Sequence, residues 1–147
     1  MGRLALAAVA ATLVDGMYGF VVFGNALVSQ FEVFPGVFRP ADGGTGPLPL
    51  MFAGILVGMC AVTYIYAKGY EGGSGLQEGL RFGLLIGVFV AGYVIGVDYG
   101  ILNIGRRLAL VLAVASLGEW LLVGGTIGLI YRPIPATAAK SARAAKV

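Results

Sequence analysis

Four long apolar runs restrict what this chain can fold into. They lie at residues 4–24, 48–67, 80–104 and 108–131, and few charged residues interrupt them. A helix needs about 20 mostly apolar residues to cross the hydrocarbon core of a bilayer, and each run reaches that length. Transmembrane β-strands would be about 10 residues of alternating polarity, a pattern that is missing here. The sequence therefore predicts an all-α membrane protein whose residues 1–131 form one four-helix transmembrane bundle.

Composition excludes most soluble function classes. Hydrophobic residues make up 59% of the chain and charged residues only 12%, whereas about a quarter of a soluble domain is charged. No nucleic-acid partner is expected. No nucleotide is expected either, because the glycine-rich stretch at residues 69–75 lacks the phosphate-loop pattern GxxxxGK[ST]. Membrane lipids and other integral-membrane subunits are the expected partners.

Missing residue types limit the chemistry further. The chain has no His and one cysteine, Cys60. Histidine-ligated haem, chlorophyll or zinc, exchange between paired cysteines, and Ser–His catalysis are therefore ruled out. We predict no catalytic, metal or cofactor-binding residue, although a lipid, quinone or pigment could still contact the bundle by packing alone. An intramembrane enzyme that uses carboxylates or tyrosine is the third possible function, after a subunit of a larger complex and a transporter.

Positive charges predict the orientation in the membrane. Lys and Arg residues accumulate beside spans on the cytoplasmic side. A cytoplasmic N-terminus puts seven cations on that side: Arg3, Lys68, Arg81, Arg132, Lys140, Arg143 and Lys146. It leaves three on the other side: Arg39, Arg106 and Arg107. We therefore predict that both termini are cytoplasmic and that residues 132–147 form a basic cytoplasmic tail.

Glycines recur four residues apart in three of the predicted spans. Residues with this spacing share a helix face, and glycine there lets two helix backbones approach closely. The face of the third span extends to Gly79, outside the predicted span. These faces pack either within the bundle or against other chains. The candidate packing residues are Gly54, Gly58, Gly83, Gly87, Gly92, Gly96, Gly124 and Gly128.

The two longer connections carry local signals. Phe31, Phe34 and Phe38 lie in the first loop, which we place outside the cytoplasm. They are typical of a segment anchored among lipid headgroups, and the alternatives are a docking patch for a neighbouring subunit or a small-molecule site. In the second loop, Ser74 and Gln77 have the spacing of a capping box, which predicts that a helix begins near Gly75.

The strongest chemical signal is a pair of acids inside spans. Asp15 and Glu119 lie near the centres of the first and last apolar runs, hence near the bilayer midplane at about 1.5 Å rise per residue. Tyr93 is predicted at the same level. Thr12 and Ser116 each precede an acid by three residues, so we expect their hydroxyl groups to donate hydrogen bonds to the acids.

Three interpretations of this candidate polar site remain open. The acids are neutral polar groups that join helices, they contact a polar group or cofactor of another subunit, or they form a proton or cation site of a transporter. No Lys or Arg lies at their depth in the predicted spans, so the sequence supplies no internal ion pair.

A short motif adds a resemblance. The segment Asp15-Gly16-Met17-Tyr18-Gly19-Phe20 with Phe23-Gly24, and the closing segment at residues 124–132, resemble small, uncharacterised bacterial inner-membrane proteins with four spans. The resemblance implies this fold and a bacterial inner-membrane location, and no activity.

Two functions follow as expectations. The first is a non-catalytic accessory or assembly subunit of a larger membrane complex, which packs through glycine faces and the aromatic periplasmic loop. The alternative is a small oligomeric transporter or channel that uses Asp15 and Glu119.

Overall fold

Four helices of the chain are long and apolar enough to cross a membrane, as predicted. A computed structural model describes residues 2–39 and 45–131, and the predicted tail at 132–147 lies outside these ranges. Within the described ranges there is no β-strand. The helices span Gly2–Ala26, Leu48–Gly69, Gly75–Ile101 and Arg106–Ile130.

Two of the spans change helix type along their length. The first consists of α1 (Gly2–Tyr18) and a π-helical segment, η1 (Gly19–Ala26), and is followed by the short α2 (Val28–Glu32). The third consists of α4 (Gly75–Phe89), the π-helical η2 (Val90–Ile95) and α5 (Gly96–Ile101). The remaining spans, α3 (Leu48–Gly69) and α6 (Arg106–Ile130), are α-helical throughout. Such π-helical turns are often found at functional sites.

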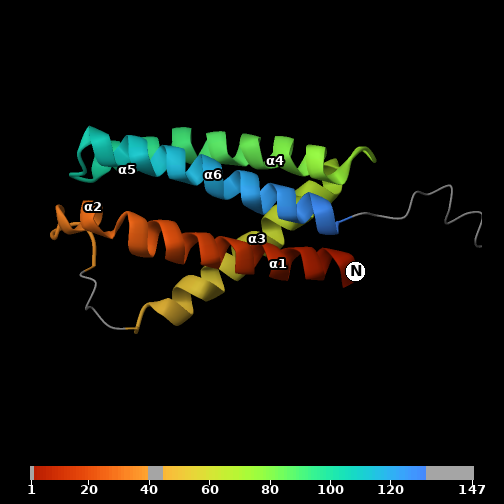
Figure 1. The fold of residues 1–147 in the computed structure, drawn as a ribbon, viewed down its shortest axis with the longest axis horizontal. Helices are drawn as coiled ribbons and strands as arrows, with labels where there is room; N and C mark the ends of the chain where they lie inside the picture. Colours follow the sequence, from red (N-terminus) through yellow and green to blue (C-terminus); the bar gives the residue numbers. More distant parts are fainter. Residues whose placement is uncertain (1, 40–44, 132–147) are drawn as a thin grey trace, which may run out of the picture.

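The spans run back and forth along the long axis of the molecule (Figure 1). The start of α1 and the end of α6 lie at one end, while α2 and the connection from α5 to α6 lie at the other. Helix α3 crosses the others obliquely and packs mainly against α1, whereas α6 packs against both α4 and α1. Helix α6 is thus the central element of the bundle.

The backbones of α4 and α6 are in direct contact. A Cβ atom added at Gly79 would collide with the carbonyl oxygen of Gly124, and one added at Gly83 would collide with that of Trp120. Only glycine leaves room for this approach, which brings whole peptide groups into van der Waals contact. The contact fixes α6, and with it Glu119, relative to the third span.

Buried apolar side chains fill the space between the other helices. Ala11 of α1, Met59 and Tyr66 of α3, and Val123 and Ile127 of α6 form one buried cluster. Alanine at position 11 lets α1 lie close to both neighbours. Around this cluster the outer faces of the helices carry exposed large apolar side chains, as lipid contact requires.

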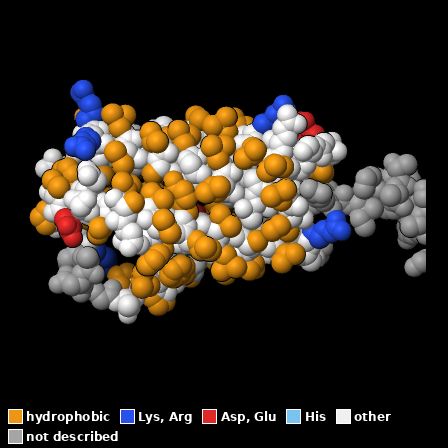
Figure 2. Space-filling view, viewed as in Figure 1, with side chains coloured by type: hydrophobic (Ala, Val, Ile, Leu, Met, Phe, Trp, Pro, Cys, Tyr) orange, Lys and Arg blue, Asp and Glu red, His pale blue; other side chains and the backbone are white. Residues whose placement is uncertain are grey.

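Hydrophobic side chains cover much of the face shown in Figure 2. Lys, Arg, Asp and Glu side chains gather at the two ends of the molecule, and only a small acidic area is visible near the middle. This distribution fits a bilayer, because charged groups at the ends reach the headgroup regions while the middle faces hydrocarbon.

The third span begins at Gly75, as the loop sequence predicts, and so starts earlier than the apolar run at 80–104. The predicted capping box is wrong, because Ser74 makes no side-chain hydrogen bond at the helix start. The carboxylate of Glu78 instead accepts hydrogen bonds from the backbone N–H groups of Glu71 and Gly73. Glu78 therefore ties the loop to the first turn of α4.

Candidate functional site

Asp15 and Glu119 line the same cavity. It has a volume of about 500 Å³ and lies between the α1–η1 span, the first half of α3 and the middle of α6. Every other described residue that lines it is apolar or glycine, and none is Lys or Arg. Two carboxyl groups from distant parts of the sequence thus border one otherwise apolar space.

Helical spacing explains how Asp15 reaches this position. Residues four apart share a helix face, and Asp15 follows the fully buried Ala7 and Ala11 at that spacing. The same face of α1 packs against α6 and α3. On α6, Glu119 follows the buried Ser116 by three residues and precedes the fully buried Val123 by four. Both acids are only half-buried themselves, because their side chains border the cavity.

Tyr18 ties the two acid-bearing helices together beside this pair. Its hydroxyl group donates a hydrogen bond to the backbone carbonyl oxygen of Ala115, at 2.8 Å. Gly118 makes room for it, since a Cβ atom there would lie 2.9 Å from the hydroxyl oxygen. Sequence reasoning missed this role. The available signal was that Tyr18 shares a helix face with Asp15, while Gly118 directly precedes Glu119.

Aromatic rings form part of the wall of the cavity. Phe20 and Phe23 come from η1, and Phe52 comes from α3. Gly16 and Gly19 also line the cavity, so the Gly/aromatic motif after Asp15 builds most of this wall. An aromatic wall offers the negative faces of its π-systems to a ligand.

Two predictions about the polar site are not met: Tyr93 lies elsewhere, and Thr12 donates its hydrogen bond to another group. Tyr93 does not line the cavity, because its side chain is 65% exposed on the outer surface of η2 and stacks on Phe89 with ring centroids 5.4 Å apart. The prediction that Thr12 donates a hydrogen bond to Asp15 is wrong. A hydroxyl group has one proton, and that of Thr12 is donated to the carbonyl oxygen of Ala8 at 2.9 Å.

The candidate packing glycines fall into two groups. Those of α4 and α6 face the opposite helix, and a Cβ atom added at any of them would meet that helix at close range: Gly83, Gly87, Gly124 and Gly128. For those of α3, η2 and α5, no described atom beyond the neighbouring backbone of the same helix lies within 4 Å of an added Cβ position: Gly54, Gly58, Gly92 and Gly96. The same spacing in the sequence therefore serves two different environments.

The three phenylalanines of the first loop fold back onto their own chain. The rings of Phe31 and Phe38 lie 4.8 Å apart. Together with Phe34 they pack against a buried cluster at the start of α6, which includes Ile104 and Leu108. This packing holds the loop at the end of the bundle.

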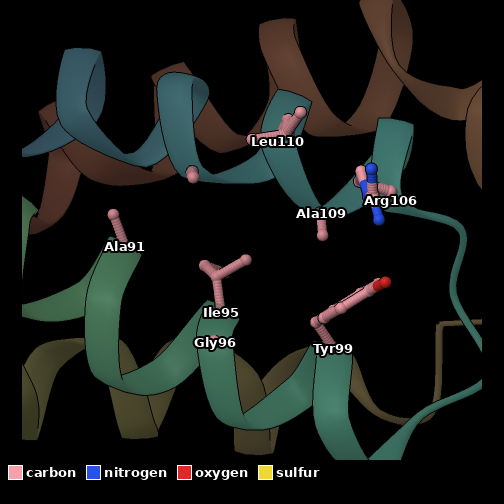
Figure 3. Close-up of a pocket in the computed structure, with 8 residues that line it drawn as sticks. Ala91, Ile95, Gly96, Tyr99, Arg106, Ala109 and Leu110 are labelled. Carbon is pink, nitrogen blue, oxygen red and sulfur yellow. The ribbon is translucent and has the colours of Figure 1, made fainter.

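A second cavity, of about 240 Å³, lies between the third span and α6. Figure 3 shows Ile95 and Tyr99 on one side of this cavity and Ala109 and Arg106 on the other. The hydroxyl end of Tyr99 points toward the side of Arg106. No described carboxylate lines it. Its one charged group is a cation, so its electrostatic character is opposite to that of the acidic cavity.

Comparisons of this chain with models of protein families, with curated proteins and with solved structures found no match. Within the described residues, no group of three or more His, Cys, Asp or Glu side chains could hold a metal ion. What the acidic cavity can do chemically is bind protons or attract a cation, because it presents two carboxyl groups in an apolar space.

Proposed function

We propose that this chain is a small membrane transporter that binds protons and a cation in turn at Asp15 and Glu119. The observation that carries the proposal is that both carboxyl groups line one cavity, where no Lys or Arg among the described residues neutralises them. A charged carboxylate at bilayer depth is costly unless it is paired. A proton or a bound cation each lowers that cost, so the two compete for the site.

This competition provides a means of exchange. When the carboxyl groups hold protons, the cavity is neutral and releases a cation. When they give up protons, the cavity is negative and takes one. A carrier that opens to each side of the membrane in turn would then move a cation in one direction and protons in the other.

Flux measurements in liposomes test the proposal. Protons are followed with an enclosed pH-sensitive dye while a gradient of Na⁺, K⁺ or benzyltrimethylammonium is imposed. Asp15→Asn and Glu119→Gln keep size and hydrogen-bonding capacity but remove the titratable proton. We expect coupled flux in the original protein and none in either variant. Asp98→Asn is the matched control, since Asp98 does not line the cavity. Absence of flux in the original protein contradicts the transport function.

A second candidate is the accessory or assembly subunit of a larger membrane complex. The observation in its favour is the glycine face of α3, where no described atom would meet a Cβ atom at Gly54 or Gly58. Such a face allows a helix of another chain to approach closely. The aromatic loop supports this proposal less, because Phe31 and Phe34 pack against the chain's own α6.

Substitution on α3 tests this second proposal. Gly58→Ile should displace a co-purifying membrane protein, since the larger side chain blocks close approach and its Cβ atom meets no other described part of the chain. Leu56→Ile, at an exposed position of the same helix, is the control. Partners are quantified by mass spectrometry after native purification in mild detergent. An unchanged set of partners would count against the subunit function.

We further propose a bacterial inner membrane as the location, with both termini cytoplasmic. The location is supported by the resemblance of the Asp15–Gly24 motif and the closing segment to bacterial inner-membrane proteins. The orientation is supported by the excess of Lys and Arg, and four of the seven cations come from residues 132–147. The other residues contribute equally to the two sides: Arg3, Lys68 and Arg81 against Arg39, Arg106 and Arg107.

A further inference from the structure

We propose that the acidic cavity binds a hydrophobic organic cation, with an ammonium or phosphonium centre that carries aromatic or aliphatic groups. The inference rests on the site of the proposed transport function and names the class of ligand. Three properties of the cavity lead to it: its charge, the chemical nature of its walls, and its position just inside the surface of the bundle.

The charge of the cavity selects a cation. Asp15 and Glu119 are the acidic residues among the described lining, and no described basic residue accompanies them. One ionised carboxylate balances a monovalent cation, and the attraction is strong because the surroundings are apolar. An anionic ligand would meet only repulsion here.

The walls do not suit an inorganic ion. Hard cations such as Ca²⁺ take six to eight oxygen ligands, and Mg²⁺ requires six in octahedral geometry. The described lining offers no Ser, Thr, Asn, Gln or Tyr side chain to complete such a shell. The carboxylates of Asp15 and Glu119 are its only side-chain oxygens. An ion that must lose its water would therefore lack replacement ligands.

The same walls suit an organic cation. Phe20, Phe23 and Phe52 present aromatic rings, and Met51 adds a polarizable side chain. Cations attached to apolar groups bind to aromatic faces by cation–π attraction, worth about 2 kcal/mol where water is excluded. The volume of about 500 Å³ lies within the range of about 300–1,000 Å³ that is usual for small-molecule sites.

Access from the lipid side favours a hydrophobic ligand. A neighbouring cavity of about 440 Å³ lies on α1 and shares Gly16, Phe20 and Phe52 with the acidic one. Phe20 is 71% exposed and Phe52 48% exposed, so these two rings separate the site from the surface of the bundle. A ligand dissolved in the membrane would reach the acids by passing them.

Glycine at position 19 gives a specific way to fill the cavity. Gly19 lines it, and apart from the neighbouring backbone of its own helix no described atom lies within 4 Å of an added Cβ position. Gly19→Leu should therefore add a side chain at the cavity wall without displacing backbone. Gly92 provides a matched control, because it also lies in a π-helical segment with open space around an added Cβ position and lines none of the cavities described above.

Binding of tetraphenylphosphonium to the protein in nanodiscs of zwitterionic lipid tests the inference. We expect saturable binding that is displaced by benzyltrimethylammonium but not by neopentylbenzene, its uncharged isostere, and not by NaCl. Asp15→Asn, Glu119→Gln and Gly19→Leu should each weaken binding by about tenfold or more, while Gly92→Leu and Asp98→Asn should leave it unchanged. Helix content and elution volume verify that each variant is folded, and the near-isosteric amide variants decide the test if Gly19→Leu fails this criterion.

Three results would overturn the inference: no saturable binding, equal displacement by neopentylbenzene, or amide variants that bind as well as the original protein. Equal displacement would mean that the cavity holds neutral lipid-like molecules. The outcome is separate from that of the flux assay. Binding without coupled flux refutes the transport function and leaves the ligand class intact. Flux driven by Na⁺ or K⁺ without binding of the organic cation refutes the ligand class and leaves the transport function intact.

Discussion

The hydroxyl group of Tyr18 donates a hydrogen bond to the backbone carbonyl oxygen of Ala115, 2.8 Å away, and so joins the first span to the last. Both residues lie close in sequence to an acid of the candidate site, Asp15 on α1 and Glu119 on α6. The bond therefore fixes the rotation of α1 relative to α6 at the level of the cavity. We regard Tyr18 as a positioning residue for the acid pair.

Loss of this hydroxyl group should destabilise the bundle. Tyr18→Phe is expected to lower the free energy of unfolding by about 1 kcal/mol, a common value for one interhelical hydrogen bond. Unfolding in mixed detergent and lipid micelles, followed by circular dichroism, measures it. Tyr93→Phe is the control, since Tyr93 is 65% exposed, and it should cause no change. Equal effects of the two substitutions would argue against the role of Tyr18.

The contact between α4 and α6 should not tolerate a methyl group. In Gly83→Ala the new Cβ atom meets the carbonyl oxygen of Trp120, so the helices must separate. The expected cost is about 1–3 kcal/mol, as for overpacking of a well-packed core. Gly92→Ala, at a position with open space, should be neutral or slightly stabilising because alanine favours helices. Thermal unfolding of both variants in one detergent checks the difference, and a neutral Gly83→Ala would contradict the close approach.

Binding of an organic cation should weaken as the pH falls. Asp15 and Glu119 attract the cation only when ionised, so protonation removes the attraction. Tyr18 is the other titratable group beside the pair, and the described lining contains no titratable residue of α3. Tetraphenylphosphonium affinity measured between about pH 5 and pH 9 should rise with pH. The pH dependence should diminish in Asp15→Asn and in Glu119→Gln, and an unchanged profile in both would exclude these acids as its source.

Topology can be tested with single cysteines in a Cys60→Ala background. A cysteine at Gly36, in the aromatic loop, should react with a membrane-impermeant maleimide added to intact cells. A cysteine at Glu71, between α3 and α4, should react only after the membrane is permeabilised. These results follow from cytoplasmic termini and the positive-inside rule. The reverse pattern would invert the proposed orientation.

Much of the fold was predictable because it depends on local sequence. Length and apolarity of a run decide whether a helix can cross a bilayer, and neither depends on the other helices. The start of the third span at Gly75 was likewise indicated by the loop sequence, although Glu78 rather than the Ser74 side chain makes the hydrogen bonds there. Glu78 accepts from backbone N–H groups of the loop, Glu71 and Gly73, which the spacing of Ser74 and Gln77 does not involve.

The candidate site was predictable only in part. The depth of Asp15 and Glu119 follows from counting residues along a helix, but depth leaves the direction of a side chain undetermined. Tyr93 was placed at the same level and points outward, while Tyr18 reaches α6. The difference arises from which face of each span packs against its neighbours, and that is a property of the whole bundle.

The sequence by itself determined four spans, the absence of histidine chemistry and the presence of two acids at bilayer depth. Only the tertiary structure decided that these acids share one cavity with a wall of phenylalanine rings. It also separated Gly83, which lies against the backbone of α6, from Gly58, which no described atom approaches. The physical reason is that hydropathy fixes where a helix lies in the membrane, whereas its rotation and its neighbours are set by side-chain packing between helices.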